Sequence, residues 1–408
     1  MRKIDIQDFR RATRDTPRAV NRRIILNLLR EHGPLSRADL ARSMDVPRGM
    51  ITALVNELLH ERLVLEGATT SAPRGRRPTL LHLRSHDRLA LGVDVRASRT
   101  VVQLTDFAGH ELARDDFSTP EDPRALSGRV VEAAGRLLEP GRRRQNVEGV
   151  GVVIPGMVDP GAGVILNAPT LGWRDVSIRR ALIRDLGVKV PIHVERDAVA
   201  CALGQIWLCD SPPDTTRDFV YMVVSEGVGT GLVVNGQPVR GRHFTAGEFG
   251  HVPLDPAGPP CSCGARGCLE AYTSDAATVA RFLGIEFAGR ESTQRMRESG
   301  PSVSEVVSRA REGDREARRA MEATGRYMGT GLAVIINALD PARIVVGGAL
   351  VAGWEMIEPL VRENVQARTL TAAAARTPID VDPDYAETRL QGAAALVVAP
   401  AFAAPRIA

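Results

Sequence analysis

The sequence predicts a winged helix-turn-helix head joined to a larger α/β body of two lobes. Residues 1–84 contain three closely spaced helical patterns followed by two strand-like runs. In residues 85–408, blocks of strands and helices alternate twice, which predicts two lobes with a cleft between them. The charge divides at the same place, because residues 1–84 carry 17 Lys and Arg against 9 Asp and Glu, and the remainder carries 36 against 40. We therefore expect two domains, 1–84 and 85–408.

The first two helices of the head are marked by apolar spacing and by the residues at their ends. The first, over 21–32, places four apolar side chains on one face, namely Ile24, Ile25, Leu28 and Leu29. It stops at Gly33 and Pro34. Ser36 is a good N-cap for the second helix, which carries Leu40 and Met44 on its apolar side.

The third helix has one apolar and one polar face. It is predicted from Pro47 to about His60, with the proline preset for the first turn. Its buried stripe consists of Ile51, Leu54, Val55 and Leu58. The opposite face is small and polar, and from it we expect Arg48, Thr52 and Asn56 to contact DNA. Two helices joined by a tight turn, the second with such a face, are typical of a helix-turn-helix.

A wing is predicted after the third helix. Two strand-like runs, Leu63–Glu66 and Thr79–Leu83, flank a polar loop. At the base of the loop, Arg76 and Arg77 are placed to contact phosphates or a minor groove. With the basic charge, this predicts that the head binds double-stranded DNA. The alternative is a three-helix bundle with a solvated hairpin.

The protein is expected to be cytoplasmic, with a core made mostly of Val, Leu, Ile and Ala. No run of about 18 apolar residues occurs, and the N-terminus lacks the apolar segment of a secretory signal. In a reducing compartment, the five cysteines are more often free or metal-bound than paired. Cys201 and Cys209 are expected to be ordinary small core residues.

The stretch from Gly247 to Glu270 has the composition of a metal site. It contains one His and three Cys, which follow the spacing His-x₉-Cys-x-Cys-x₄-Cys. They are His251, Cys261, Cys263 and Cys268. A Cys₃His set predicts a structural zinc site with no ligand position left for water. Gly264 and Gly267 permit the left-handed turns that would fold three sulfurs around one ion. The alternative is a cysteine-rich turn without a metal.

Motifs across nearly the whole chain resemble the ROK family of repressors and sugar kinases, which has the actin-like ATPase fold. They are SRADLA, GRRP, IPGMVD, APTLGW, DAVACALG, GVGTG, AGEFGH, CSCGARGCLE and IVVGGAL. The pair AGEFGH and CxCGxxGCLE is very specific. A chain that carries a helix-turn-helix head resembles the sugar-responsive regulators of the family rather than its free-standing kinases.

The resemblance implies a sugar site around the metal site. In kinases of the family, the Asp at the position of Asp197 is the base for the sugar hydroxyl, and the equivalents of Glu248, His251 and Glu270 bind sugar hydroxyls. His251 would then use one ring nitrogen for zinc and the other for sugar, so that the metal orients it. The alternative is that these acids pair with nearby arginines. Asn167 is expected either to line the same cleft or to form a turn.

Two arginines depart from the family pattern. Arg196 stands where Asn usually precedes the Asp, and it would either neutralise Asp197 and Glu248 or select an anionic or phosphorylated sugar. Arg96 replaces the glycine of the family's Asp-x-Gly-x-Thr phosphate turn, where its side chain should crowd the phosphates. We therefore expect no kinase activity, with Asp197 as a vestigial base, although the glycines of GVGTG survive.

Together these features predict a sugar-responsive transcriptional regulator, most often a repressor, that binds operator DNA as a homodimer or homotetramer. Sugar would shift the population between DNA-competent and incompetent arrangements of the heads. One alternative is a ROK sugar kinase with an appended DNA-binding head, and another is a body that senses a protein partner. The segment Gly284–Pro301 is polar and is either a mobile insertion or a short helix.

Overall fold

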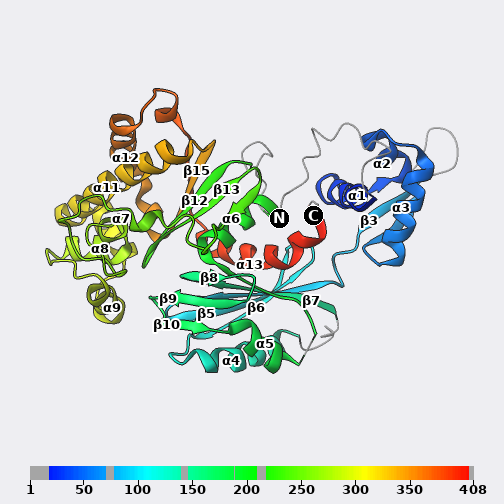
Figure 1. Cartoon of the computed structure of the whole chain (residues 1–408), viewed down its shortest axis with the longest axis horizontal. Helices are drawn as coiled ribbons and strands as arrows, with labels where there is room; N and C mark the ends of the chain where they lie inside the picture. The colour runs from blue at the N-terminus through cyan, green and yellow to red at the C-terminus, as the bar shows by residue number, and fades with distance from the viewer. Residues whose placement is uncertain (1–17, 70–77, 139–145, 188, 209–216, 404–408) are drawn as a thin grey trace.

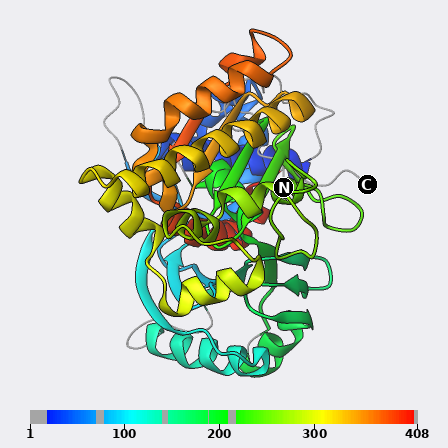
Figure 2. The same cartoon turned by 90° about the vertical axis from the view of Figure 1, so that its left-hand side faces the viewer.

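The head and the two lobes of the body are distinct in the computed structural model, which describes residues 18–69, 78–138, 146–187, 189–208 and 217–403. Figure 1 shows the head on the right, beside the two lobes. Figure 2 shows the lobes one above the other, with α11 and α12 in the upper lobe and α4 at the base of the lower one. None of the helices in these ranges combines the length and the apolar character that crossing a membrane requires.

The described part of the head has the predicted winged helix-turn-helix form. Its elements are α1 (Arg18–His32), β1 (Leu35–Ser36), α2 (Arg37–Met44), α3 (Arg48–His60), β2 (Val64–Thr69) and β3 (Thr79–Leu83). The three strands form one antiparallel sheet in the order β1-β3-β2. Four apolar side chains of α3 are buried as predicted, namely Ile51, Leu54, Val55 and Leu58.

Helix α2 begins and ends through local polar contacts. The Ser36 side chain accepts a hydrogen bond from the backbone N–H of Asp39, and the Asp39 carboxylate accepts one from the backbone N–H of Ser36. This reciprocal capping box satisfies two donors that the first turn leaves free. Asp45 ends the helix in the left-handed conformation at φ 50°, which allows the tight turn into α3.

Helix α1 is buried on more than the one face that the sequence predicts. Six consecutive residues are buried, from Ile24 to Leu29. Ile25 and Leu28 belong to the face predicted for the core of the head, whereas Leu26 and Asn27 lie outside that face. A helix that is buried around its circumference has partners on both sides, and here the second partner is the body.

Each lobe of the body is built on a five-stranded sheet, and the two sheets have the same topology. The first contains β4 (Leu89–Val95), β5 (Arg99–Asp106), β6 (Glu111–Ser118), β7 (Val147–Ile154) and β11 (Ile192–Arg196). The second contains β12 (Phe219–Val224), β13 (Val228–Val234), β14 (Gln237–Val239), β15 (Arg343–Gly347) and β16 (Ile379–Asp382). Their orders are β6-β5-β4-β7-β11 and β14-β13-β12-β15-β16, with the last three strands parallel in each.

Smaller elements complete the lobes. In the first lobe these are α4 (Pro123–Leu137), α5 (Ile178–Leu186) and a three-stranded sheet of β8 (Met157–Asp159), β9 (Val164–Ala168) and β10 (Trp173–Val176). The second lobe carries α7 (Leu269–Thr273), α8 (Asp275–Phe282), α9 (Arg290–Ser299), α10 (Val303–Arg311), α11 (Arg315–Leu339) and α12 (Trp354–Arg368). The sequence did not predict β6, a highly charged strand, because its pattern has no apolar alternation.

Two helices, α6 (Asp197–Trp207) and α13 (Tyr385–Phe402), lie between the two large sheets. Close backbone approaches at glycines hold each pair of neighbouring layers together. A Cβ on Gly151 of β7 would lie 1.9 Å from the Ala393 carbonyl of α13, and one on Gly231 of β13 would lie 2.2 Å from the Ala198 carbonyl of α6. Between the helices, a Cβ on Gly392 would lie 2.2 Å from the Ala200 carbonyl. The order of the layers is therefore the sheet of the first lobe, α13, α6 and the sheet of the second lobe.

We predict that Ser36→Ala lowers the free energy of unfolding of the head by about 1 kcal/mol, because it removes the N-cap of α2. The matched control is Ser43→Ala, which changes an exposed serine of the same helix. Chemical denaturation followed by circular dichroism compares the two variants with the wild type. Equal stability of the two variants would contradict a role of the cap.

Candidate functional site

The predicted ligand residues gather where the two lobes meet. Arg196 is the last residue of β11 and Asp197 the first of α6. Glu248 precedes the short 3₁₀ helix η3 (Phe249–His251), and Glu270 lies in α7. Gly247 allows Arg196 and Glu248 to lie close together. Its φ of 90° is one that residues with a Cβ rarely adopt, and a Cβ there would lie only 2.9 Å from the Arg196 guanidinium.

Four side chains of this region can hold a metal ion. The ligand atoms of His251, Cys261, Cys263 and Cys268 all lie within 4.8 Å of one another. His251 Nδ1 is 3.6 Å from Cys261 Sγ, and Cys263 Sγ is 3.8 Å from Cys268 Sγ. Donors held about 2.0–2.3 Å from a tetrahedral ion are separated by similar distances. The predicted left-handed glycines are present, with φ 95° at Gly264 and 66° at Gly267.

His251 faces two ways. Its Nδ1 points to Cys261 in the metal-binding cluster, while its Nε2 lies 3.8 Å from the Glu248 carboxylate. Glu270 is buried next to the same cluster, where one oxygen accepts a hydrogen bond from the Val228 N–H and the other from the Cys261 thiol. The metal-binding cluster and the predicted sugar residues are therefore parts of one connected site.

Burial dominates the electrostatics of this site. It raises the pKa of the Glu248 carboxyl above its ordinary value, although the neighbouring Arg196 acts in the opposite direction. It also raises the pKa of Cys268 to about 11 and that of Cys261 further. A bound dication would reverse the effect at the thiols, since metal ligation requires thiolates.

Arg196 is bonded on several sides and is nearly buried. Its Nη1 donates to Glu248 Oε1 at 2.6 Å, and its Nη2 donates to the carbonyls of Thr230, at 3.1 Å, and Ala246. The prediction that Arg196 neutralises Glu248 is confirmed, but the same prediction for Asp197 is wrong. The Asp197 side chain pairs with a different arginine because it projects from the first turn of α6 toward α13.

That second arginine is Arg389, which the sequence analysis missed. It is 4% exposed, and its Nε donates to Asp94 Oδ1 at 2.8 Å while its Nη1 donates to Asp197 Oδ2 at 2.9 Å. Its Nη2 donates to the Val95 carbonyl at 3.1 Å. Burial disfavours the charge of Arg389, yet Asp94 and Asp197 outweigh burial and raise its pKa. Asp197 and Glu248 are thus each paired with an arginine.

The turn between β4 and β5, which resembles the phosphate turn of the family's kinases, carries an arginine that is paired with a carboxylate. Arg96 lies between β4 and β5, where its Nε donates to Asp94 Oδ2 at 2.6 Å. Asp94 is therefore bonded by two arginines. In the second glycine motif, a Cβ on Gly227 would lie 2.9 Å from Glu270, and Gly231 packs on α6. Packing accounts for these two glycines without a phosphate.

The segment Gly284–Pro301 contains the helix α9 (Arg290–Ser299), so the short-helix alternative is correct. From α9, Arg297 donates to the Thr170 carbonyl of the other lobe at 3.0 Å. The same guanidinium lies 3.8 Å from Glu226, beside the second glycine motif. Helix α9 therefore connects the two lobes next to the candidate site.

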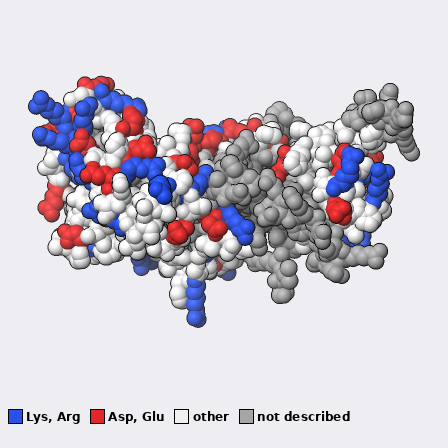
Figure 3. Space-filling view, turned by 90° about the horizontal axis from the view of Figure 1, so that it is seen from above, with Lys and Arg blue, Asp and Glu red and all other residues white. Residues whose placement is uncertain are grey.

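The predicted DNA-contact face of α3 is exposed. Arg48, Thr52 and Asn56 all point away from the core of the head. Thr52 donates to the Arg48 carbonyl, and the Asn56 carbonyl oxygen is 3.5 Å from Arg37. Figure 3 shows basic side chains on the described part of the head, at the right, and mixed charges over the body.

Further predictions concern five residues away from this face. Arg76, Arg77 and Cys209 lie outside the described residues. Cys201 is fully buried in α6, as predicted for a core residue. Asn167 lies in β9, paired with β8 and β10, so the turn-forming alternative is wrong.

Residues 90–399 match the model of the ROK family. The chain belongs to the ROK family. It is 25% identical over 394 residues to the xylose repressor of Caldicellulosiruptor bescii, covering 95% of this chain and 98% of the relative. It is 26% identical over 367 residues to the DNA-binding transcriptional dual regulator NagC of Escherichia coli K12, covering 90% and 89%.

Solved ROK proteins share the fold. A ROK family transcriptional regulator, a homolog of the E. coli MLC protein, matches with a TM-score of 0.78 at 23% identity, over 94% of this chain and 96% of that one. A ROK hexokinase from Thermus thermophilus matches with a TM-score of 0.58 at 30% identity, over 76% of this chain and 97% of that one. The kinase match leaves about a quarter of this chain uncovered. The body thus has the actin-like ATPase fold of the family, as predicted.

We predict that Arg389→Met lowers the free energy of unfolding by about 3–5 kcal/mol, because it leaves Asp197 without its arginine and the fully buried Asp94 with Arg96 alone. The exposed Arg326→Met is the matched control and should cost less than about 1 kcal/mol. Adding Asp197→Asn to Arg389→Met should recover part of the loss. Chemical denaturation measures all three, and a loss that the second change leaves intact would show that the unpaired charge of Asp197 is not its cause.

Proposed function

We propose that this protein is a sugar-responsive, DNA-binding transcriptional repressor. The observation that carries the proposal is a winged helix-turn-helix head on a ROK body, in one chain that aligns over nearly its whole length with proteins named as repressors. The relatives are named for different sugars, xylose in one case and N-acetylglucosamine in another. The names therefore support the class of effector, and the identity of the sugar is a matter for experiment.

The sugar binds between the lobes, in contact with Asp197, Glu248 and His251, and with Glu270 beside the metal-binding cluster. Carboxylate oxygens and a ring nitrogen that share one partly open region suit a ligand rich in hydroxyl donors. The side chains of Asp197, Glu248 and His251 are 16%, 28% and 33% exposed. Each is thus accessible to a small molecule while its position is held by a neighbour.

The effector is a neutral sugar. Arg196 lies beside the site, but its charge is matched by Glu248 and its donors also serve two backbone carbonyls. An anionic or phosphorylated sugar would have to displace these bonds and leave Glu248 without its cation. A hydroxyl group requires no such exchange.

The body does not work as a kinase. In a ROK kinase mechanism, Asp197 would accept the proton of the sugar hydroxyl, yet here its carboxylate is bonded by Arg389. The carboxylate of Asp94 is likewise held by Arg389 and Arg96, at the turn where a phosphate would have to approach. ROK kinases share the fold, so the absence of activity is part of the test below.

The metal is zinc, and its role is structural. Three thiols and an imidazole are the donors that zinc prefers, and a set of four protein ligands leaves no position for a substrate. Since His251 also faces Glu248, zinc would fix the orientation of the imidazole ring that contacts the sugar.

The head binds operator DNA through α3 and the wing. Arg48, Thr52 and Asn56 would contact base edges, and Arg76 and Arg77 would contact phosphates or the minor groove. Two heads of a homodimer, or pairs of heads in a homotetramer, would match the half-sites of a palindromic operator. The division into domains 1–84 and 85–408 assigns all five of these residues to the head.

The test is a titration of the full chain with its own promoter DNA at fixed salt, with xylose, glucose, N-acetylglucosamine and glucose 6-phosphate, each with and without ATP. We expect one neutral sugar to shift the Kd for DNA without ATP. Glu248→Gln should raise the Kd for that sugar about tenfold, through loss of a charged hydrogen bond, and leave DNA binding without sugar unchanged. Glu363→Gln, on the exposed side of α12, is the matched control.

Other outcomes would contradict specific parts of the proposal. A response only to glucose 6-phosphate would overturn the assignment of a neutral effector. A response that requires ATP, with consumption of ATP, would favour the kinase with an appended head. Binding of DNA without a response to any sugar would favour a body that senses a protein partner.

We predict about one zinc per chain in protein purified without chelators. Cys263→Ser should lose most of this zinc and lower the melting temperature, because it removes one of four ligands. Cys201→Ala, in the core and away from the metal-binding cluster, should keep the full zinc content. Elemental analysis of the three proteins is the measurement, and equal zinc in Cys263→Ser and wild type would exclude this ligand set.

A further inference from the structure

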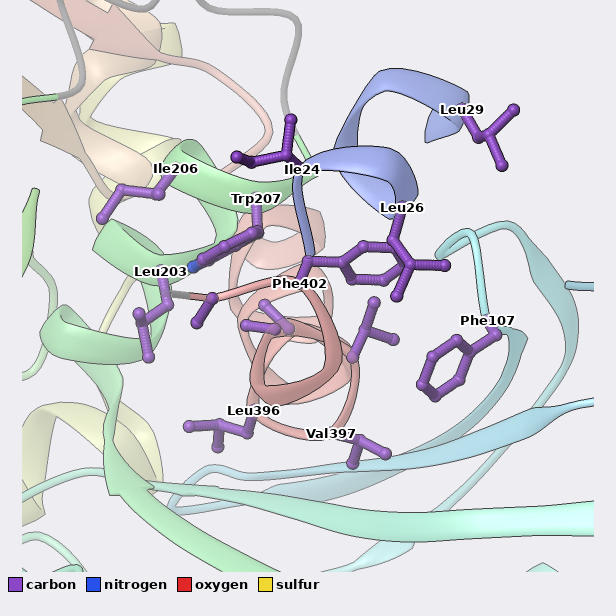
Figure 4. Packing of buried hydrophobic residues seen from close by; sticks show 14 of the residues in the cluster. Ile24, Leu26, Leu29, Phe107, Leu203, Ile206, Trp207, Leu396, Val397 and Phe402 are labelled. Atoms are coloured by element: carbon purple, nitrogen blue, oxygen red, sulfur yellow. The ribbon is translucent and has the colours of Figure 1, made fainter. Parts of the chain in front are cut away.

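The head and the body share an interface formed by Asn27 and Arg30 of α1 with Trp207 and Phe402. Asn27 Nδ2 donates to the Phe402 carbonyl at 2.8 Å, and Asn27 is fully buried. The Arg30 guanidinium lies 5.1 Å from the Trp207 ring centroid and 5.1 Å from that of Phe402. Figure 4 shows these rings in one apolar cluster with Ile24 and Leu26 of α1.

The two aromatic residues are the ends of two different helices. Trp207 is the last residue of α6, and Phe402 is the last residue of α13. Arg30 therefore contacts both helices at once. A displacement of either helix end by a few ångströms would break one of the two cation–π contacts, since these are effective only within about 6 Å.

The same two helices are bonded to each other at the candidate sugar site. Asp197 is the first residue of α6, and Arg389 lies in the second turn of α13. Their ion pair at 2.9 Å joins the helices about 15 to 20 Å along each helix from the head–body interface, at 1.5 Å per residue. Helix α13 packs on the sheet of the first lobe and α6 on that of the second, so the pair also reports the relative position of the lobes.

We propose that α6 and α13 carry the sugar signal to the head, with Arg30 as the residue that senses both helix ends. The proposal rests on the sugar site proposed above. A sugar hydroxyl that donates to the second lone pair of Asp197 Oδ2 weakens the ion pair, because it shares with Arg389 an oxygen on a carboxylate whose Oδ1 accepts the Ala198 N–H. Weakening of this ion pair lets α6 and α13 shift against each other. The shift changes the surface of the body on which α1 packs, and this in turn changes the position of α3.

The head has a core of buried apolar side chains besides the polar and aromatic contacts of the interface. That core includes Ile25, Leu28, Leu40, Ile51 and Leu54, and it is continuous with the apolar cluster around Trp207 and Phe402. Arg30 is not in that core and does not lie on the exposed face of α3. Loss of its contacts should therefore change how the head is held, while the helix-turn-helix itself persists.

The test compares the full-length wild type with Arg30→Met, which keeps an unbranched apolar side chain but removes the guanidinium. For each protein, fluorescence anisotropy gives the Kd for operator DNA with and without the neutral sugar that acts most strongly among xylose, glucose and N-acetylglucosamine. Calorimetry gives the Kd for that sugar. The ratio of the two DNA constants is the coupling between the sites, about 5–150-fold in allosteric proteins.

We expect the ratio in Arg30→Met to fall below about twofold, although both DNA and sugar still bind. Arg18→Met is the matched control, since Arg18 lies on the same helix but pairs with Glu57 within the head, and it should keep the wild-type ratio. A wild-type ratio in Arg30→Met would overturn the proposal. If Arg30→Met does not fold, Trp207→Leu removes one of the same contacts from the body and must lower the ratio.

Failure of the proposed function has a different signature. If the wild type binds none of the sugars, or binds one with no change in DNA affinity, the sugar-responsive function itself is overturned, and the coupling with it. If the wild type responds and both variants respond equally, the function stands and only the coupling route is wrong.

Discussion

The arrangement of the body depends on a single buried guanidinium. Arg389 connects Asp94 at the end of a strand in the first lobe with Asp197 at the start of α6, which packs on the second lobe. Burying three charged groups is costly unless each is paired with good geometry. Here the arginine serves both carboxylates, so the cost of burial is offset only while the two lobes keep this relative position.

In the proposed function, the same pairing would separate this protein chemically from the kinases that share its fold. A catalytic carboxylate must be free to accept a proton, and a phosphate turn must leave room for backbone N–H groups to approach an anion. Arg389 and Arg96 pair with Asp94, and Arg389 also pairs with Asp197, which are the two carboxylates that such chemistry would use. In the regulator proposed above, these positions would serve in binding and in communication between parts of the molecule.

Metal binding and ligand binding would be joined through one imidazole. His251 has its two nitrogens directed to different partners, Cys261 on one side and Glu248 on the other. Fixing one nitrogen orients the other, so a structural ion would contribute to the affinity for a ligand that it never touches. The short sequence between Gly247 and Glu270 would thus combine folding and recognition.

Local sequence determined much of this protein. The N-cap Ser36, the buried stripe of α3 and the Cys₃His spacing each act within about 20 residues. The structure has the cap, the buried stripe and the cluster of four side chains that they predict. The motifs also identified the family. Periodicity and capping are local signals, because they depend on hydrogen bonds and side-chain contacts between near neighbours in the chain.

Only the tertiary structure decided which charges pair and where the head rests. Asp197 and Arg389 are 192 residues apart, and Asn27 and Phe402 are 375 apart. A lone arginine in the apolar helix α13, and a leucine and an asparagine off the expected face of α1, were the signals that sequence analysis left unused. They had several possible partners, and the choice among them is made when the sheets and helices pack, because pairing of buried charges depends on distance in space rather than along the chain.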